Sequence, residues 1–473
     1  MKRKKILSDR KDSNGNRFIG IINAFYIAKQ CNQKPMFTWD AVSKAHLLVE
    51  DYKNFNKQRF ISTALDTKEN IFSKNFIQEH CLTYEDKSSL SLATDEKFRY
   101  LKKFKNYILN TNYDYYEITR TEDYIKDIWK DLDICNYTQS AAEIFNNINF
   151  TEKVASIIKQ AHLKATELKN TNGGGALIAF HIRAGDTVYP FANFRKLALM
   201  NFHPTPIELA YEIIKDLAKD TKVIIFSDDI NSVEELKRVL NSKNIFLAEE
   251  FRDYHQFSNT ELFLFDTVLM SHAKKIYGTH SAVAKFAATI GGVELINPHT
   301  IYPANKIYQI YKENFGKLDL HDAHKAQTLF YTYLAARASG EEFEKLISLL
   351  EQALKYDYEN DKYRIYILDT LICNNEFKRA DEYLGQILQT RKEDFFSYLA
   401  IDNGNTCKEL LLKYCLINTQ KYQNLNQIAQ KIKQMPFCKK FFKKTSRKLR
   451  LYLPQKHLWF KKYFKGYYNH RYL

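Results

Sequence analysis

The chain has 473 residues, 45% of them hydrophobic, and a formal net charge of +16. This length excludes a single ordinary domain, and with only 14 glycines and 8 prolines long flexible linkers are not expected. Seven scattered cysteines with no C-x-x-C pair argue against a disulfide framework or a zinc site. The first residues lack the apolar stretch of a secretory signal, and no run approaches the ~18 apolar residues of a membrane-spanning helix.

The first third is predicted to begin as an α/β unit. Residues 14–30 combine a Gly-Asn turn with helical apolar spacing, and residues 35–39 have the apolar character of a strand. Residues 50–150 indicate only mixed helix and loop. A helix is expected over 151–168, and the glycine run 173–175 predicts a hinge with a domain boundary near it.

The next part of the chain alternates between apolar runs and amphipathic segments. We expect strand 176–180, helix 205–218, strand 222–227, helix 232–240, strand 244–247, helix 261–272, strand 275–278 and helix 281–290. Such alternation with apolar strands predicts a parallel, doubly wound sheet. Because ligands of open α/β sheets bind beyond the carboxyl ends of the strands, polar residues there are candidates for a site.

Three of the expected strand ends carry polar residues. They are His181, Arg183 and Asp186, then Ser227, Asp228 and Asp229, and finally Thr279, His280 and Ser281. We expect no helix to begin before Asp186. The guanidinium group of Arg183 is permanently charged and suited to binding phosphate. A surface arginine that forms an ion pair with Asp186 would give the same sequence pattern. Asp228 and Asp229 fit a nucleotide contact, part of a metal site, or the cap of the helix that follows.

From about residue 319 the pattern is wholly helical. A segment that begins near Phe343 recurs near Phe377, and this spacing of 34 residues is the period of tetratricopeptide-like helix pairs. A looser third copy is indicated at 419–425. Two or three such copies alone would be marginal, so we expect them to stack on the α/β body.

The positive charge is concentrated at the end of the chain. Residues 431–473 hold 14 Lys or Arg and no Asp or Glu, so the rest of the chain keeps 57 basic and 55 acidic residues. Phe, Tyr and Trp are interleaved with these basic residues, as in helices that lie on anionic lipid. A segment of this composition would also bind nucleic acid, but the chain contains no recognisable nucleic-acid-binding module. We therefore favour a membrane surface and expect no nucleic-acid partner.

The segment His181-Ile-Arg183-Ala-Gly-Asp186 resembles the His-x-Arg-Arg-x-Asp motif of the α1,2-, α1,6- and protein O-fucosyltransferase superfamily. The resemblance continues in the same order over residues 14–300. Ser227-Asp228-Asp229 is similar to the paired acids of α1,6-type members. Asp266, followed by Gly278-Thr279-His280-Ser281, is similar to their last motif, and Asn14-Gly15-Asn16 resembles the Gly-x-Gly-Asn turn that opens many of these enzymes.

This resemblance implies a two-domain GT-B fold, a GDP-sugar donor and inverting transfer without an essential metal or another cofactor. Arg183 would hold the donor diphosphate and stabilise the leaving GDP, and Asp228 or Asp229 would contact guanine or ribose. The other donor-binding residues that the resemblance implies are Asn16, His181, Asp266, Thr279 and Ser281.

Two departures from the family concern the chemistry. Ala184 stands where the family has its second arginine, and residues 188–191 lack the glutamate of α1,6-type members. An attacking hydroxyl needs a base within hydrogen-bond reach, and Asp186 is the first candidate, followed by His203. The donor sugar is therefore open between fucose, another GDP-hexose and a GDP-heptose.

We expect four parts in the chain. They are an N-terminal acceptor-side α/β domain over 1–165, a GDP-sugar-binding Rossmann-like domain over 166–318, tetratricopeptide-like repeats over 319–430 and a basic aromatic amphipathic tail over 431–473. The expected function is a fucosyltransferase-like glycosyltransferase that acts on a glycan or lipid-linked saccharide in surface polysaccharide synthesis. It is expected in the cytoplasm, peripheral on the inner face of the membrane. The alternative is a non-catalytic helical-repeat scaffold with a degenerate nucleotide-sugar-binding domain.

Overall fold

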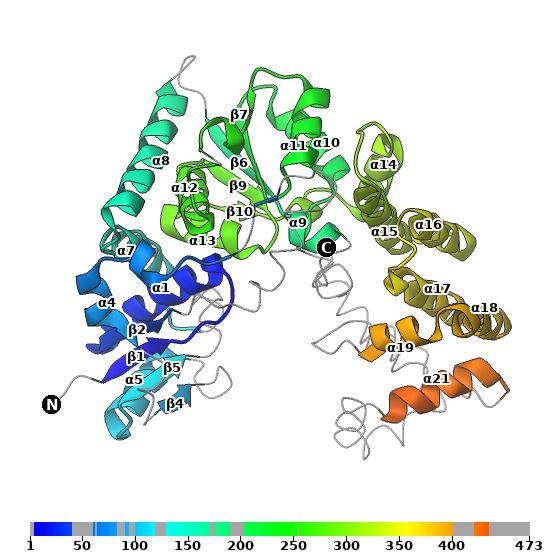
Figure 1. The fold of residues 1–473 in the computed structure, drawn as a ribbon, viewed down its shortest axis with the longest axis horizontal. Coiled ribbons are helices and arrows are strands. Elements are labelled where there is room, and N and C mark those ends of the chain that lie inside the picture. Colours follow the sequence, from blue (N-terminus) through cyan, green and yellow to red (C-terminus); the bar gives the residue numbers. More distant parts are fainter. Residues whose placement is uncertain are drawn as a thin grey trace. The chain divides into compact units, whose positions relative to one another are not determined.

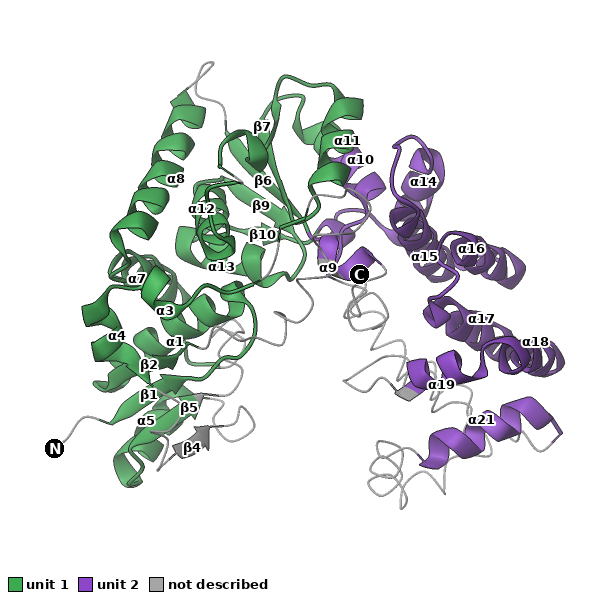
Figure 2. Cartoon of the chain, in the orientation of Figure 1, with its two compact units in different colours: residues 1–182, 214–297 green, residues 183–213, 298–473 purple. Residues whose placement is uncertain are grey.

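The computed structural model (Figure 1) describes residues 4–39, 60–61, 64–82, 90–93, 100–118, 129–170, 176–189, 203–253, 255–400 and 421–434. The predicted hinge at 173–175 and almost all of the basic tail lie outside these residues. The chain forms two compact units (Figure 2), residues 1–182 with 214–297 and residues 183–213 with 298–473. The domain boundaries expected from the sequence stay predictions.

The first unit contains a sheet of five parallel strands in the order β3-β2-β1-β5-β4. Its central strand, β1 (Lys5–Ser8), was not predicted, whereas β2 (Lys34–Thr38) confirms the strand expected at 35–39. The helix expected at 14–30 is present as α1 (Asn14–Cys31). The other elements of this region are α3 (Lys68–Ile71), α4 (Lys74–His80), β3 (Cys81–Leu82), β4 (Leu90–Ala93), α5 (Leu101–Asn110), β5 (Tyr115–Ile118), α7 (Ile134–Asn146) and α8 (Glu152–Asn170).

The same unit contains a second parallel sheet, in the order β10-β9-β6-β7-β8. Its central strands β6 (Leu177–Ile182) and β7 (Lys222–Ser227) are buried along their whole length, as expected for strands covered on both faces. The other elements are α11 (Ile230–Leu240), β8 (Ile245–Leu247), η5 (Ala248–Glu250), α12 (Asn259–Ser271), β9 (Lys275–Gly278), α13 (Ala282–Gly291) and β10 (Leu295–Ile296). Two parallel α/β sheets followed by helices confirm the predicted fold class.

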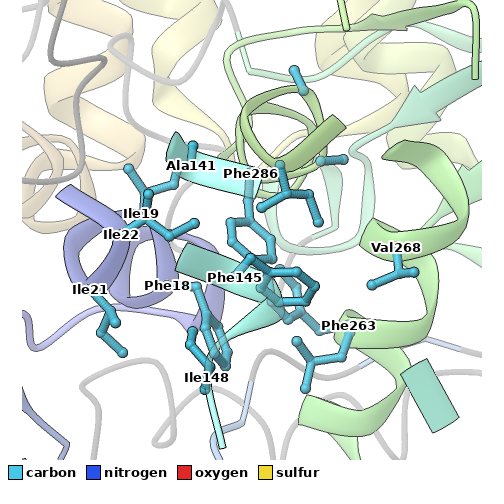
Figure 3. Packing of buried hydrophobic residues seen from close by; sticks show 14 of the residues in the cluster. Phe18, Ile19, Ile21, Ile22, Ala141, Phe145, Ile148, Phe263, Val268 and Phe286 are labelled. Atoms are coloured by element: carbon cyan, nitrogen blue, oxygen red, sulfur yellow. The ribbon is translucent and has the colours of Figure 1, made fainter. Parts of the chain in front are cut away.

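An aromatic cluster joins the elements of the two sheets (Figure 3). Phe18 of α1 lies 5.7 Å from Phe263 of α12 and 5.5 Å from Phe286 of α13, measured between ring centroids. Phe145 of α7 packs edge-on against Phe286 at 5.6 Å. Phe18 and Phe286 are fully buried, so each contributes roughly 2–3 kcal/mol of burial energy to holding α1 against α13.

The second unit is helical. It contains α9 (Gly185–Val188), most of α10 (Ile207–Leu217), η6 (Pro298–Thr300), α14 (Ala304–Asn314), α15 (Asp322–Ala338), α16 (Phe343–Tyr356), α17 (Asp361–Cys373), α18 (Phe377–Thr390), α19 (Lys392–Ala400) and α21 (Gln423–Gln434). α16 and α18 begin at Phe343 and Phe377, the equivalent positions of the two sequence copies. An ion pair of 2.6 Å between Glu344 and Arg379 joins these two helices. The tetratricopeptide-like assignment stays a prediction.

One local expectation was wrong. A helix begins inside the segment 181–186, because β6 continues through Ile182 and α9 starts at Gly185. The carbonyl of Ala184 accepts hydrogen bonds from the N–H groups of Thr187, at 3.1 Å, and Val188, at 2.9 Å. Asp186 therefore lies in a short helical turn rather than in an extended loop.

Candidate functional site

The carboxyl ends of β6, β7 and β9 lie side by side in the first unit. β6 pairs with β7 on one side and β9 on the other, and Ile182 is in register with Ser227 while His181 is in register with Gly278. A Cβ on Gly278 would lie 3.3 Å from the Cβ of His181, so a larger residue there would crowd the histidine. The carboxyl ends that precede Asp228 and Thr279 therefore form one edge, where open α/β sheets bind ligands.

Two helix N-termini meet at this edge. α13 follows β9 directly, and α1 follows β1, so each begins beyond the carboxyl end of a strand. Gly15 allows the contact, because a Cβ there would lie 2.6 Å from the carbonyl carbon of Ala282. In the described structure, the N-cap residues Ser13 and Ser281 make no side-chain cap, and neither helix has an acidic residue in its first turn. This junction therefore offers N–H groups and positive helix dipoles to an anion.

The turn that opens α1 is fixed by hydrogen bonds. Asn16 donates to the carboxylate of Asp12 at 2.8 Å, and Asp12 also pairs with Arg10. Asn14 accepts a bond of 3.3 Å from the hydroxyl of Thr260 on α12. The predicted donor residue Asn16 thus lies at the helix junction, with its side-chain amide held toward Asp12.

Asp66 links the region of the first sheet to that of the second, and it was not singled out from the sequence. Its carboxylate accepts from the hydroxyl of Ser258 at 2.5 Å and from the N–H of Thr260 at 3.2 Å. Its own N–H donates to the Thr260 hydroxyl at 3.1 Å. These partners lie more than 190 residues away in sequence, so no local pattern could have revealed the contact.

The two acids after β7 have different environments. Asp229 is fully buried and caps α11, because its carboxylate accepts from the N–H of Ser232 at 3.4 Å. Asp228 is partly exposed, and its carbonyl accepts from the N–H of Ile61 at 3.0 Å. The capping alternative therefore holds for Asp229, and only Asp228 of the two acids is partly exposed.

Asp266 lies on α12 in a buried charge cluster. Arg252, whose side chain is 1% exposed, forms ion pairs with both Asp266 and Glu249. Burial raises the pKa of Asp266 to about 6, and the nearby Arg252 guanidinium opposes this shift. One oxygen of Asp266, Oδ1, is buried without a hydrogen-bond partner among the described residues. Arg252 was not predicted as a site residue, since nothing in its local sequence marks it as the partner of Asp266.

Arg183 and Asp186 belong to the second unit. Arg183 is partly buried and is the first residue after β6, and the backbone of Asp186 belongs to the first turn of α9. The side chain of Asp186 lies outside the described part of the structure. His203, the second candidate for the base, is partly buried just before α10.

Thr279 and Ser281 are buried at the start of α13, whereas His280 between them is exposed. Across the described residues, no three His, Cys, Asp or Glu side chains gather closely enough to hold a metal ion. Within the same residues, none of the helices has the length and apolar character needed to cross a membrane.

Comparisons with known proteins give only distant likenesses. No protein-family model matches the chain, and no curated protein matches it in sequence. Among solved structures, the chain is similar to NodZ α-1,6-fucosyltransferase soaked with GDP-fucose, at 12% identity and a TM-score of 0.33, over 61% of this chain and 93% of that one. It is also similar to NodZ from Bradyrhizobium, at 13% identity and a TM-score of 0.32, over 61% and 92% of the two chains. A third likeness is to a substituted FUT1 of Arabidopsis thaliana in complex with GDP, at 12% identity and a TM-score of 0.35, over 63% and 70%. Because these scores are low, we base the functional proposal on this chain's own residues.

Proposed function

We propose that this chain is an inverting glycosyltransferase of GT-B type that takes its sugar from a GDP-sugar. The observation that carries the proposal is the junction of α1 and α13 beyond the carboxyl ends of two parallel sheets. Two uncapped helix N-termini suit a diphosphate, and Arg183 follows the central strand β6 immediately in the chain. The motif order along residues 14–300 is what favours a guanine nucleotide.

We propose roles from the motif order, together with the burial and contacts of the two aspartates. Arg183 would bind the diphosphate and stabilise the negative charge that develops on it. Asp228, the partly exposed member of its pair, would contact guanine or ribose, while Asp229 caps α11. The remaining proposed donor contacts, at strand ends and helix starts, are Asn16, His181, Thr279 and Ser281. Asp266 would support donor binding through α12, since its contacts are with Arg252.

The proposed reaction is one displacement. A hydroxyl oxygen of a glycan or lipid-linked saccharide attacks C1 of the donor sugar, and the bond from C1 to the diphosphate oxygen breaks. GDP leaves with the electron pair, and the hydroxyl proton passes to a base, for which we propose Asp186 before His203. The donor sugar is proposed to be fucose or another GDP-linked sugar.

The first test is thermal stabilisation by ligands, compared between GDP, GDP-fucose, GDP-mannose, UDP, CMP and ADP, with and without EDTA. At 100 times its dissociation constant, a true ligand stabilises the fold by about 2.7 kcal/mol. We expect GDP and one GDP-sugar to raise the melting temperature, with no effect of EDTA. Equal response to all nucleotides, or dependence on metal, contradicts the proposal.

The matched variants are Arg183→Ala and Arg238→Ala. Arg238 is an exposed arginine of α11 paired with Glu235, so its loss controls for the loss of one positive charge. We expect Arg183→Ala to lose stabilisation by GDP and to stop donor turnover, and Arg238→Ala to keep both. Release of GDP from the donor without acceptor separates the transferase from a scaffold, which would release none.

We also propose that residues 431–473 hold the protein against an anionic membrane from the cytoplasmic side. This rests on the excess of basic residues and interleaved aromatic residues in that sequence.

A further inference from the structure

The second unit contains a group of buried polar side chains that the proposed chemistry does not use. We call it the Glu208 cluster, and it consists of Tyr189, Glu208, Tyr311, His324 and Thr328. Each of these side chains is at most 5% exposed, and they come from the end of α9, from α10, from α14 and from α15. The cluster therefore links four segments that are separated in sequence.

The contacts within the cluster are directional. The hydroxyl of Thr328 donates to Oε2 of Glu208 at 2.7 Å. His324 lies one turn before Thr328 on the same face of α15, and the ring of Tyr189 packs edge-on against it at 5.5 Å. Tyr189 also packs at 5.1 Å against His321, whose Nδ1 accepts from the N–H of Ala323 at the start of α15.

This cluster is costly to bury. Burial raises the pKa of Glu208, and the Thr328 hydroxyl and nearby His324 oppose that shift. The pKa of Tyr311 is raised by burial and by Glu208, and its hydroxyl has no hydrogen-bond partner among the described residues. Apolar side chains of the same volume would join the helices at lower cost. A polar cluster is better suited than an apolar contact to fixing one register between α10 and α15.

The segment whose position depends on this cluster is α9. It has four residues, and a helix this short cannot hold its own conformation because one hydrogen-bonded turn does not offset the entropy of ordering it. Its position must come from tertiary contacts, and α9 contacts α15 within this unit. Tyr189, which packs on His321 and His324, follows the last residue of α9 directly.

We propose that the Glu208 cluster positions α9, and with it Arg183 and Asp186, so that α15 supports the segment that carries these two residues and does more than open the helical region. Thr328 and Glu208 are thus positioning residues that act through His324 and Tyr189. The consequence for the donor rests on the proposed function, whereas the structural coupling between α15 and α9 does not.

The coupling is tested by hydrogen exchange on the full chain. Thr328→Val keeps the side-chain volume but removes the hydroxyl that Glu208 accepts from, and Thr328→Ser restores a hydroxyl. The control is Asp369→Asn, which weakens another, partly buried contact of α15, the ion pair of 2.9 Å between Arg337 and Asp369. We expect amides 184–189 to exchange about tenfold faster in Thr328→Val, and at the wild-type rate in Thr328→Ser and Asp369→Asn. No change in Thr328→Val, or an equal change in Asp369→Asn, overturns the coupling.

The consequence for the donor is tested with the same variants. In Thr328→Val we expect the KM for the GDP-sugar to rise on the order of tenfold and kcat to fall, since Arg183 is displaced. A merely structural defect would lower the active fraction and leave KM unchanged, as expected for Asp369→Asn. If the wild type binds no GDP-sugar, the proposed function fails while the exchange result still decides the coupling. Faster exchange without a change in KM would overturn the proposed support of donor binding by α15.

Discussion

Two histidines of the first unit share a hydrogen bond. Nδ1 of His162 on α8 lies 2.6 Å from Nε2 of His272 at the end of α12, and the rings are perpendicular. Burial lowers the pKa of His272 to about 4, with further lowering by His162 and Lys169, and burial also lowers the pKa of His162. A bond between two imidazoles needs one proton between them, so a second proton breaks it.

This pair makes stability depend on pH. The unfolded His272 takes up a proton near its ordinary pKa of 6.5, whereas the folded one does so only near 4. The stability that this pair contributes is therefore fully present above about pH 6.5 and is lost as the pH falls toward 4. Because the pair is only half-buried, we expect a loss of about 1 kcal/mol between pH 7 and pH 5 in urea unfolding. The double variant His162→Gln/His272→Gln should show a shallower dependence, and an unchanged slope would contradict this account.

The buried Arg252 gives a second prediction at this scale. Arg252→Gln leaves the carboxylate of Asp266 buried without its cation, and we expect the free energy of unfolding to fall by about 3 kcal/mol at pH 7. The pKa of Asp266, already raised to about 6, should rise further, so the neutral acid persists and the loss shrinks toward pH 5. Denaturation at the two pH values measures this. Adding Asp266→Asn should recover part of the stability, and a loss that is the same at both pH values would contradict the prediction.

At the scale of elements, the contact between α1 and α13 depends on Gly15. In Gly15→Ala, the new methyl would meet the carbonyl carbon and oxygen of Ala282 at 2.6 and 2.7 Å. The helices must then separate, and we expect a loss of about 1–3 kcal/mol of stability together with weaker GDP binding. Chemical unfolding and a GDP titration measure the two effects. Because the clash is with backbone atoms, adding Ala282→Gly should not restore either, and full recovery would contradict the geometry.

Many elements were predictable because their signals are local. The strands at 222–227 and 275–278 agree with β7 and β9, since short apolar runs bounded by polar residues carry their own limits. β1 was missed because Lys5–Ser8 is short and lies in a basic stretch, and it becomes a central strand only through pairing with β2 and β5. α9 was missed because its position depends on contacts with α15.

The candidate site was predictable only in part. The polar strand ends could be found because each follows an apolar run, and their convergence follows from the order of parallel strands. The sequence could not separate Asp229, which caps α11, from Asp228, nor reveal Asp66 and Arg252. Those assignments depend on contacts between distant segments, which local periodicity does not encode.

At the scale of the whole molecule, the compact units do not follow the order of the chain. Residues 183–213, which carry the arginine motif, group with 298–473, while 214–297 groups with 1–182. The helical part is therefore a structural partner of the motif segment and not a separate appendage. Sequence patterns divide the chain only at hinges and changes of composition. They cannot reveal that each compact unit combines segments that are separated in the sequence.

The basic tail gives the last prediction. A chain that ends at Gln434, the last residue of α21, loses 12 of the 14 basic residues of the tail. It should no longer sediment with vesicles of anionic lipid, which the full chain should bind. Each basic residue near such a surface contributes about 1 kcal/mol, so a few are enough. Binding should weaken with salt, because screening shortens the reach of charge to about 10 Å at 0.1 M.

A second tail variant separates charge from insertion. Replacing Trp459, Phe460 and Phe464 by Ser keeps every basic residue but removes apolar area that an interfacial helix buries. If aromatic insertion contributed nothing, this variant would leave anionic vesicles at the same salt concentration as the wild type, because its charge is unchanged. We instead expect release at lower salt than for the wild type. Equal salt dependence, or preference of the full chain for RNA over vesicles, would contradict the membrane assignment and favour a purely electrostatic partner.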